Sequence, residues 1–488
     1  REEFPSDALT DMEAGSTSGA GYTNGAGSSE YKMLSYFARV NYTLMDRYLL
    51  EVNMRADASS RFHKDHRWGY FPSFSAGWRM NEEGFMKDIE WINNLKIRAS
   101  YGTLGNINNV GNYDYFQNYS SGNHYNFSDS PVIGIGESKP ANETLGWEKV
   151  ALTDIGLDFD IFNGLLGVTA DYYIKNTSDI LLGYNVPTET GITAAPSQNI
   201  GKVKNTGFEL ALNHRNKIGA VNYSIGANIA TNKNKITNLG GSDNIIQTSS
   251  YIVKYILKKG ESIGSFYGFK TDGLYTQADI DAGHYYTLSG VVPNAGDVKF
   301  VPQRDIEYKQ EITDEDRTIL GKDVPDFTYG VNLSLQYKGF EFSMFGQGIS
   351  GTKVAFDVYG VHPFYHGQDN PRKYHLKRWT EENPNPYAAY PRLYSASSVH
   401  TTYNRNFSDY NLFDSDYFRF KTLSLGYTVP SATVKSWGLQ SLKVYVTGEN
   451  LFTVRADKKM EDFDPETAGG VIYTLGTKSV AFGVNISF

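Results

Sequence analysis

The sequence contains no cysteine among its 488 residues. This absence excludes disulfide bonds, metal sites built on thiolates and cysteine nucleophiles. Long apolar runs are also missing, and none approaches the 18 residues that a transmembrane helix requires. Charge of one sign is not in excess either, because 46 Lys and Arg accompany 54 Asp and Glu and leave a net charge of -8. This mixed, mildly acidic balance argues against nucleic acid as a partner.

Aromatic residues, in contrast, are abundant. They make up 14% of the chain, with 36 Tyr and 28 Phe. Such an excess fits the aromatic girdles of a membrane-spanning barrel, although a glycan-binding or adhesive β protein could also be rich in tyrosine. Glycine is frequent as well, with 48 residues, as expected for a chain with many turns and strand kinks.

The C-terminal segment alternates between two kinds of residue. One parity is apolar and consists of Val480, Phe482, Val484, Ile486 and Phe488. The other parity is small or polar and consists of Ala481, Gly483, Asn485 and Ser487. A period of two places these sets on opposite faces of a strand. An apolar outer face and a polar inner face suit a strand that stands in lipid around a hydrated lumen, and we expect this strand to carry barrel assembly.

The same alternation recurs along the chain and predicts about thirteen strands. They lie at about 35–43, 48–55, 69–80, 92–103, 147–161, 165–175, 205–214, 220–231, 326–337, 340–350, 415–428, 441–453 and 476–488. The fold class is therefore predicted to be all-β, a transmembrane antiparallel β-barrel. Residues 1–34 are expected to form an extracellular loop segment and 35–488 the C-terminal part of the barrel, with long extracellular loops at about 104–146, 176–204, 232–325, 351–414 and 454–475.

Strand parity carries a further expectation. Short and long connections alternate, as they do when turns face the periplasm and loops face outward. If the last strand ends in the periplasm, thirteen strands require the first to start outside, and 232–325 must hold zero or an even number of barrel strands. An odd number cannot close a bacterial barrel alone. The chain, which begins Arg1-Glu2-Glu3 without Met, is thus expected to be the later part of a larger barrel or to have lost a leader.

Several segments resemble one known family. They are Ser35–Tyr42 through Arg55–Phe62, Trp68–Arg79, Leu95–Gly102, Gly264–Phe269 and Asp326–Gly330. These segments resemble, in order, those of the SusC/RagA-type TonB-dependent transporters from the outer membrane of Bacteroidetes. The resemblance implies a 22-stranded barrel, a plug domain that this sequence does not include, and a segment ahead of the plug that contacts TonB. It also implies a SusD-like surface lipoprotein as partner, an outer membrane bilayer with lipopolysaccharide as surroundings, and no cofactor.

Charged residues recur on the polar parity of the predicted strands. The predicted lumen-facing charges are Arg39, Arg55, Arg79, Arg98, Asp154, Asp158 and Asp160. They could tune the electrostatics of a hydrated lumen, or the arginines and aspartates could pair and brace the wall. Charge in the lumen is normal for such barrels, so bracing or plain solvation is favoured.

Two predicted loops contain clusters of aromatic residues. The candidate substrate contacts are Tyr113, Tyr115, Phe116, Tyr119 and Tyr125 in one loop, and Tyr359, Phe364, Tyr365 and Trp379 in the other. Flat rings with a polar tip can stack on sugars or on peptide side chains. They can equally pack a rigid loop or a partner protein, since aromatic residues favour interfaces of every kind.

Patterns that would indicate other chemistry are weak. Gly260-Glu261-Ser262-Ile263-Gly264 fits the nucleophile-elbow pattern, but a strand-like stretch follows it where an elbow needs a helix. His362, His366 and His375 share a long loop without metal-ligand spacing, so they are expected to be solvated. Asp272, Asp279 and Asp281 lack the spacing of a calcium loop. No catalytic residue and no metal site is predicted.

The sequence therefore favours active import of a nutrient oligomer, a glycan or a peptide, as the SusC-like component of a complex with a SusD-like lipoprotein. The chemistry of the family enters this expectation by analogy alone. A passive porin is the alternative within the same class. A surface adhesion or scaffold barrel that displays Tyr-rich loops is a second alternative, and an outer-membrane hydrolase using Ser262 is the weakest.

Overall fold

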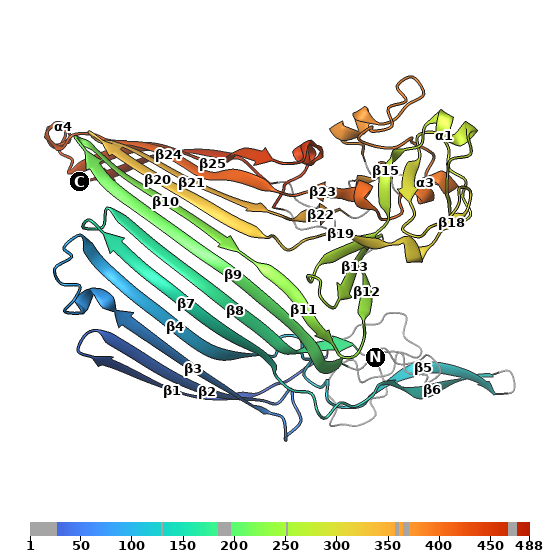
Figure 1. Cartoon of the computed structure of the whole chain (residues 1–488), viewed down its shortest axis with the longest axis horizontal. Helices are drawn as coiled ribbons and strands as arrows, with labels where there is room; N and C mark the ends of the chain where they lie inside the picture. Colours follow the sequence, from blue (N-terminus) through green and yellow to red (C-terminus); the bar gives the residue numbers. More distant parts are fainter. Residues whose placement is uncertain are drawn as a thin grey trace.

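The computed structural model describes residues 27–127, 130–183, 197–249, 252–356, 361–364, 370–466 and 476–488. Its main element is an antiparallel sheet of fourteen strands (Figure 1). Thirteen of them follow one another in space, and β11 pairs with β9 beside this path. In spatial order the thirteen are β1 (Met33–Leu44), β2 (Tyr48–Ser59), β3 (Trp68–Arg79), β4 (Ile92–Asn106), β7 (Glu148–Ile161), β8 (Leu166–Gly183), β9 (Ser197–Ile218), β10 (Val221–Thr231), β20 (Phe327–Tyr337), β21 (Phe340–Ser350), β24 (Tyr417–Thr428), β25 (Ser441–Arg455) and β26 (Ser479–Ser487).

The strand register aligns apolar residues into one continuous face, here called the apolar face. Near one edge of the sheet, Val52 lies opposite Val40 on β1 and Phe74 on β3. At the other edge, Val446 on β25 lies opposite Phe482 on β26. Phe482 is 84% exposed, so nothing in the described part of the chain covers it. An apolar face of this extent is stable only against lipid or another apolar surface.

The opposite parity forms the polar face of the sheet. In its middle, Ser334 on β20 lies opposite Ser224 on β10 and Ser343 on β21. Near the first edge, Asn53 lies opposite Ser73. A one-residue slip in any pairing would move polar side chains into the apolar face, so the alternation itself fixes the register.

The connections between strands differ in length at the two ends of the sheet. At one end, here called the turn end, they are short and span 45–47, 80–91, 162–165, 219–220, 338–339 and 429–440. At the other, the loop end, they span 60–67, 107–147, 184–196, 232–326, 351–416 and 456–478. The tightest turns use left-handed backbone, as at Lys338 (φ 45°) and Gly339 (φ 89°), which is the geometry that two-residue hairpins need.

The observed sheet confirms the all-β class and the expectation of about thirteen strands. Residues 232–325 were expected to hold zero or an even number of barrel strands, and the structure places none between β10 and β20, which pair directly. The predicted loop at 176–204 is wrong in extent, since β8 continues to Gly183 and β9 begins at Ser197. The register of this pair shifts between Thr177 and Ile180, and Asp179 has φ 58°. Such a bulge breaks the period of two, which hides the rest of the strand from a search for alternation.

The long connections contain secondary structure of their own, which Figure 1 shows beyond the loop end. The strands there are β5 (Asn118–Phe127), β6 (Ser130–Lys139), β11 (Lys233–Leu239), β12 (Asn244–Ser249), β13 (Val253–Lys258), β14 (Ser265–Gly268), β15 (Lys270–Leu274), β16 (Thr287–Leu288), β17 (Val298–Val301), β18 (Glu311–Ile312), β19 (Thr318–Lys322), β22 (Lys353–Ala355) and β23 (Leu412–Asp414). The helices of the described residues are α1 (Gln277–Asp281), α3 (Val399–Asn404), α4 (Ser431–Lys435) and the 3-10 turns η2 (Met80–Glu82), η4 (Asp314–Asp316), η6 (Lys373–Lys377), η7 (Asp409–Asn411) and η8 (Lys458–Asp462). None of the described helices is long and apolar enough to cross a bilayer.

The connections from β10 to β20 and from β21 to β24 pack together, and we call them the loop body. Its largest core consists of Phe269, Leu274, Leu288, Ala295, Val298, Phe300, Ile312, Trp379, Ala388 and Tyr403. These residues come from both connections, so the loop body is held by its own apolar burial and stands at the loop end of the sheet (Figure 1).

Candidate functional surface

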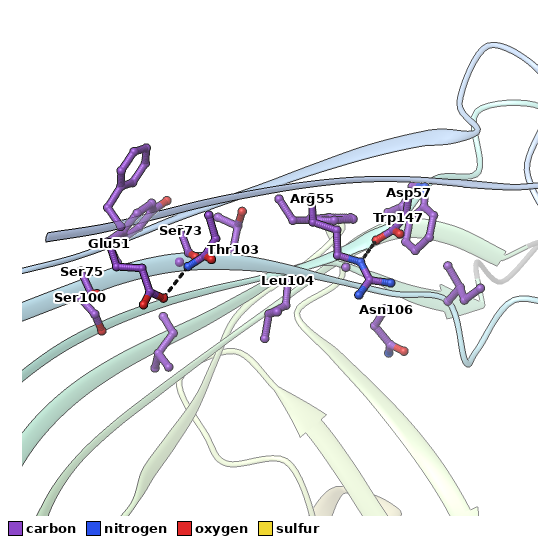
Figure 2. A pocket seen from close by; sticks show the side chains of 18 of the residues that line it. Glu51, Arg55, Asp57, Ser73, Ser75, Ser100, Thr103, Leu104, Asn106 and Trp147 are labelled. Carbon is purple, nitrogen blue, oxygen red and sulfur yellow. Dashed lines mark hydrogen bonds and ion pairs between the residues drawn. The ribbon is translucent and has the colours of Figure 1, made fainter. Parts of the chain in front are cut away.

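A cavity of about 730 Å³ lies on the polar face of β2, β3 and β4 (Figure 2). Polar side chains at alternate positions of these strands line it, among them Glu51, Arg55, Ser73, Ser100 and Asn106. They reach the same face because each strand contributes every second residue. The cavity is large enough for several residues of an oligomer.

Ion pairs orient the charged groups of this cavity. Nε of Arg55 donates a hydrogen bond of 2.6 Å to Oδ2 of Asp57, and Nδ2 of Asn53 donates one of 2.7 Å to Oε1 of Glu51 (Figure 2). Glu51 is also paired with Arg39. The Asp57 carboxylate is almost fully buried, whereas more than half of the Arg55 side chain is exposed. The cavity therefore presents a positioned cation among hydroxyl and amide groups, which suits hydrogen bonding to a polar ligand.

Arg98 forms a second charged cluster further along the polar face. Its Nε lies 2.8 Å from Oδ2 of Asp158, and its Nη2 lies 2.9 Å from Oδ1 of Asp171. Asp154 is more distant, at 4.0 Å from Nη1. These contacts join β4 to β7 and β8, so the arginine braces three adjacent strands.

The other predicted charges have separate partners. Asp160 accepts a hydrogen bond of 3.1 Å from Asn94, and Nη1 of Arg79 donates one of 3.2 Å to the carbonyl of Asp46 at the turn end. Sequence reasoning missed Asp171, the second close partner of Arg98. The alternation along β8 could have placed Asp171 on the polar face. It could not have shown that β8 lies close enough to β4 for Asp171 to reach Arg98.

A third cluster ties the last long connection to the wall. Nη2 of Arg419 lies 2.6 Å from Oδ1 of Asp464, and its Nη1 lies 2.8 Å from Oε2 of Glu466. Lys421 contacts the same Glu466 carboxylate at 2.5 Å. Because Arg419 is buried, this network fixes the segment around Asp464 and Glu466, in the connection between β25 and β26, against β24.

The first predicted aromatic cluster remains exposed in part. Tyr113, Phe116 and Tyr119 each keep about half or more of their surface exposed. The hydroxyl of Tyr113 lies 3.2 Å from the amide nitrogen of Glu30, and Tyr115 packs on Phe116 with ring centroids 4.2 Å apart. Tyr125 belongs to β5, but its side chain lies outside the described part of the structure.

The second aromatic cluster is not a common surface. Trp379 is 5% exposed and packs inside the core of the loop body, so its assignment as a substrate contact is wrong. An aromatic residue in an irregular segment has no periodicity that would reveal its burial. Phe364 is exposed, whereas Tyr359 and Tyr365 lie outside the described residues.

Two of the loop histidines are buried, so the expectation that they are solvated is wrong for them. His362 and His375 are each 2% exposed. Nδ1 of His362 lies 3.0 Å from the hydroxyl of Tyr390, and Nε2 of His375 lies 2.8 Å from the carbonyl of Val361. Burial, reinforced by the positive charge of Arg405, lowers the pKa of His362 to about 3. Burial also lowers the pKa of His375. His366 lies outside the described residues.

A buried ion pair stabilises the loop body beside η4. Nη2 of Arg304 lies 2.6 Å from Oδ2 of Asp316, whose side chain is fully buried. Burial alone would raise the pKa of Asp316. The hydrogen bonds from Arg304 and from the backbone amides of Thr313 and Gln303 outweigh it and lower this pKa to about 2.

The other sequence patterns take structural roles. Ser262 donates a hydrogen bond of 2.8 Å to the carbonyl of Ile263 and is followed by strand β14, so the strand–turn–helix context of a nucleophile elbow is missing there. Asp279 accepts from Thr276 as part of the N-terminal cap of α1, and Asp281 accepts from Gln277. Among the described residues, no three His, Asp or Glu side chains gather closely enough to hold a metal ion.

Comparisons with known proteins agree with this architecture. The TonB-dependent receptor P3 of Formosa agariphila is 32% identical over 431 residues, which cover 87% of this chain and 41% of that receptor. The TonB-dependent receptor SusC of Bacteroides thetaiotaomicron is 29% identical over 93% of this chain and 43% of its own length. The chain thus spans less than half the length of these curated relatives.

A solved structure shares the fold. The structure described as that of the RagAB peptide transporter superposes with a TM-score of 0.77 at 26% identity, covering 99% of this chain and 50% of that chain. The sequence also matches the family described as "TonB dependent receptor-like, beta-barrel" over residues 5–451. The chain therefore belongs to the TonB dependent receptor-like β-barrel family, whose members are outer-membrane proteins.

Proposed function

We propose that the protein to which this chain belongs imports a nutrient oligomer actively across the outer membrane, in a TonB-dependent manner. The observation that carries this proposal is the two-faced sheet. Its apolar face continues across thirteen strands, and its polar face bears cavities and oriented charges. A sheet of this kind suits a wall with lipid on one side and a hydrated lumen on the other.

In this proposal the polar face lines the lumen. The charges Arg39, Arg55, Arg79, Arg98, Asp154, Asp158 and Asp160 would then be lumen-facing, and the ion pairs described above would brace the wall around the path of the substrate. The exposed guanidinium of Arg55 and the hydroxyl groups around it supply hydrogen bonds to a polar cargo. The loop end would face outward, with the exposed Tyr113, Phe116 and Tyr119 near the point where substrate arrives.

The substrate class we propose is a glycan oligomer or a peptide. The structural neighbour described as a peptide transporter supports the peptide, and the resemblance to SusC/RagA-type transporters motivates the glycan. We further propose that a SusD-like surface lipoprotein covers the loop body, that a plug fills the lumen, and that TonB acts through the part of the protein outside this chain. Chemistry on the substrate has no place in this proposal.

The test is uptake by cells in which the gene of the whole protein is deleted and then restored. Labelled oligopeptides and labelled glycan oligomers of matched size are offered separately, with and without an uncoupler of the inner-membrane proton gradient. We expect restored cells to accumulate one of the two classes and to lose accumulation with the uncoupler. Uptake that persists without the gradient, together with ion conductance in planar bilayers, would identify a passive porin. Binding without uptake would identify an adhesion protein.

A further inference from the structure

A group of exposed lysines lies on two adjacent strands at the loop end of the sheet. Lys202 and Lys204 belong to β9, and Lys233 and Lys235 belong to β11. All four side chains are exposed. Figure 1 shows β8, β9 and β11 side by side, and the pairing of β9 with both neighbours agrees. We call these four residues the lysine patch.

The register brings like charges together within the patch. Lys204 lies directly opposite Lys235, and Lys233 lies opposite Thr206 one step along the same face. Side chains directly opposite on neighbouring strands have Cβ atoms about 5 Å apart, and like charges at such positions destabilise a sheet. A sheet tolerates this arrangement more easily when an anion lies between the charges.

The described part of the chain does not supply that anion. None of the four lysines has a carboxylate within 4.0 Å there, whereas the neighbouring Lys149 is paired with Asp179 at 3.7 Å. The backbone of Glu261 lies beside β11, because its carbonyl accepts a hydrogen bond from the amide of Ile236. The Glu261 side chain is exposed and lies within 4.0 Å of no patch lysine among the described residues. Asn176 lies opposite Lys204 on β8 and adds a neutral hydrogen-bond donor to the same face.

The lysine patch lies on the same side of the sheet as the apolar face. On β9, Leu210 and Phe208 point to that face, because they lie opposite Ala170 and Tyr172 of β8. Thr206, Lys204 and Lys202 follow at the same parity towards the loop end. Lys204 lies four residues beyond Phe208, about 13 Å along the strand at the usual rise per residue. The apolar band of such barrels is about 25 Å tall and ends at the head-group level. Phe208 is the last apolar residue of this parity before the lysines, so the patch lies on the loop-end side of the apolar residues of β8 and β9.

We propose that the lysine patch binds the phosphorylated head groups of outer-leaflet glycolipids. Three features carry this proposal: unpaired like charges opposite one another, exposure on the side of the sheet that faces lipid, and a position on the loop-end side of the apolar residues of β8 and β9. Ammonium groups attract anionic head groups most strongly at the surface of a membrane. The proposal rests on the orientation in the proposed function, in which the loop end faces outward.

The experiment uses the complete purified protein in detergent micelles. Its thermal unfolding is followed while a phosphorylated outer-leaflet glycolipid, the same glycolipid after removal of its phosphates, or inorganic phosphate is added. We expect the melting temperature to rise with the phosphorylated lipid only, and the rise to weaken with added salt. In the variant Lys204→Gln/Lys233→Gln/Lys235→Gln, the lipid concentration needed for half of this rise should increase about tenfold or more.

Lys175→Gln is the matched control. Lys175 lies on β8 opposite Asn205, so it is an exposed lysine of the same region on the polar face. This variant should respond to lipid as the parent does. The proposal is overturned if the triple variant stays within twofold of the parent, if the dephosphorylated lipid acts equally well, or if inorganic phosphate alone reproduces the rise. Should the triple variant fail to fold, Lys235→Gln and the salt dependence of the parent decide the question.

Failure of this inference can be separated from failure of the proposed function. The chain has no native cysteine, so Lys235→Cys and Lys338→Cys can each be labelled with an impermeant thiol reagent on intact cells, against the unmodified parent. Labelling at 235 and not at 338 supports the assumed orientation. If the parent protein imports its substrate but does not bind the lipid, the proposed role of the lysine patch is contradicted and the import function is not. If it binds the lipid but shows no energy-dependent uptake, the import function alone is contradicted.

Discussion

Arg98 on β4 and Asp158 on β7 are joined by two parallel hydrogen bonds, from Nε to Oδ2 at 2.8 Å and from Nη2 to Oδ1 at 3.0 Å. The same guanidinium also contacts Asp171 on β8. One side chain thus pairs with carboxylates from two further strands, and only the contact with Asp158 is bidentate.

Replacing Arg98 with Ala should therefore destabilise the wall. The change leaves neighbouring carboxylates without their cation, and we expect a loss of about 2 kcal/mol in the free energy of unfolding, less than for a fully buried pair because the site is partly hydrated. Denaturant-induced unfolding in micelles measures it. Arg79→Ala, on the same face with one backbone contact, should cost less than about 0.5 kcal/mol. Equal losses in the two variants would contradict the bracing role.

The assignment of the two faces can be tested with one pair of neighbouring residues. Leu333 on β20 lies opposite Ile225 and Met344 on the apolar face, and Ser334 lies opposite Ser224 and Ser343 on the polar face. Leu333→Arg should destabilise the folded barrel in lipid by about 2–4 kcal/mol, whereas Ser334→Arg should have little effect. The amount of heat-resistant folded protein in native membranes reports the difference. A larger effect at position 334 would reverse the proposed orientation of the sheet.

Arg419 should control the order of the connection that follows β25. Arg419→Met removes the cation shared by Asp464 and Glu466 and should destabilise the anchored segment by about 3 kcal/mol, because the guanidinium is buried. Amide hydrogen exchange of residues 456–466 should become faster. Lys443→Gln breaks the pair with Glu341 at the turn end and serves as the control. Unchanged exchange in the Arg419 variant would show that packing of Phe463 in its apolar cluster suffices to hold this segment.

The loop body should weaken in acid through Asp316. The pKa of this group is lower in the folded protein than its ordinary value of 3.8, so its contribution is present above about pH 4 and is lost as the pH falls towards 2. The shift corresponds to about 2 kcal/mol at neutral pH. Amide exchange of residues 303–317, corrected for the intrinsic effect of pH, should accelerate across this window. Asp316→Asn should remove the acceleration, and an unchanged pH profile in that variant would contradict the assignment.

His362 predicts a second pH dependence at milder acidity. Its pKa of about 3 in the folded state lies below the ordinary value of about 6.5, so the unfolded chain binds the proton first. The contribution of neutral His362 to the free energy of unfolding is fully present above pH 6.5. Below that pH it should fall by up to about 1.4 kcal/mol per pH unit. Hydrogen exchange around η6 between pH 7 and 5 measures this effect. His362→Gln should flatten the profile without abolishing it, because the pKa of His375 is lowered too. The exposed His66, changed to Gln, should leave the slope unaltered.

The strands could be predicted from sequence because each carries its own evidence. A residue such as Val484 has its polar neighbours at odd offsets, and that local period fixes both the strand and the face. The bulge at Asp179 removes this local signal, so the continuation of β8 was missed. The segments of the loop body have no regular period in sequence that would predict their packing. Phe269 and Tyr403 share one core although more than a hundred residues separate them. The sequence around either residue does not predict this contact.

The errors at the candidate site also concern contacts between segments that are distant in sequence. The charges of the wall were found because parity orders them, whereas the partner of Arg98 on β8 depends on which strands are neighbours. Trp379 and His362 were interpreted as surface residues because both lie in a long predicted loop without a regular period. Trp379 is buried in a core that two separate connections share, and His362 is buried beside Tyr390 of its own connection, so both burials are tertiary effects.

The direct pairing of β10 with β20 has an evolutionary consequence. Their ladder runs from Val221 opposite Tyr337 to Thr231 opposite Phe327, so the long insertion between them leaves the hydrogen-bonded seam untouched. The residues after Leu239 can therefore diverge between relatives without disturbing the ladder that joins β10 to β20. Such divergence must be matched in the connection from β21 to β24, because the two connections share one apolar core.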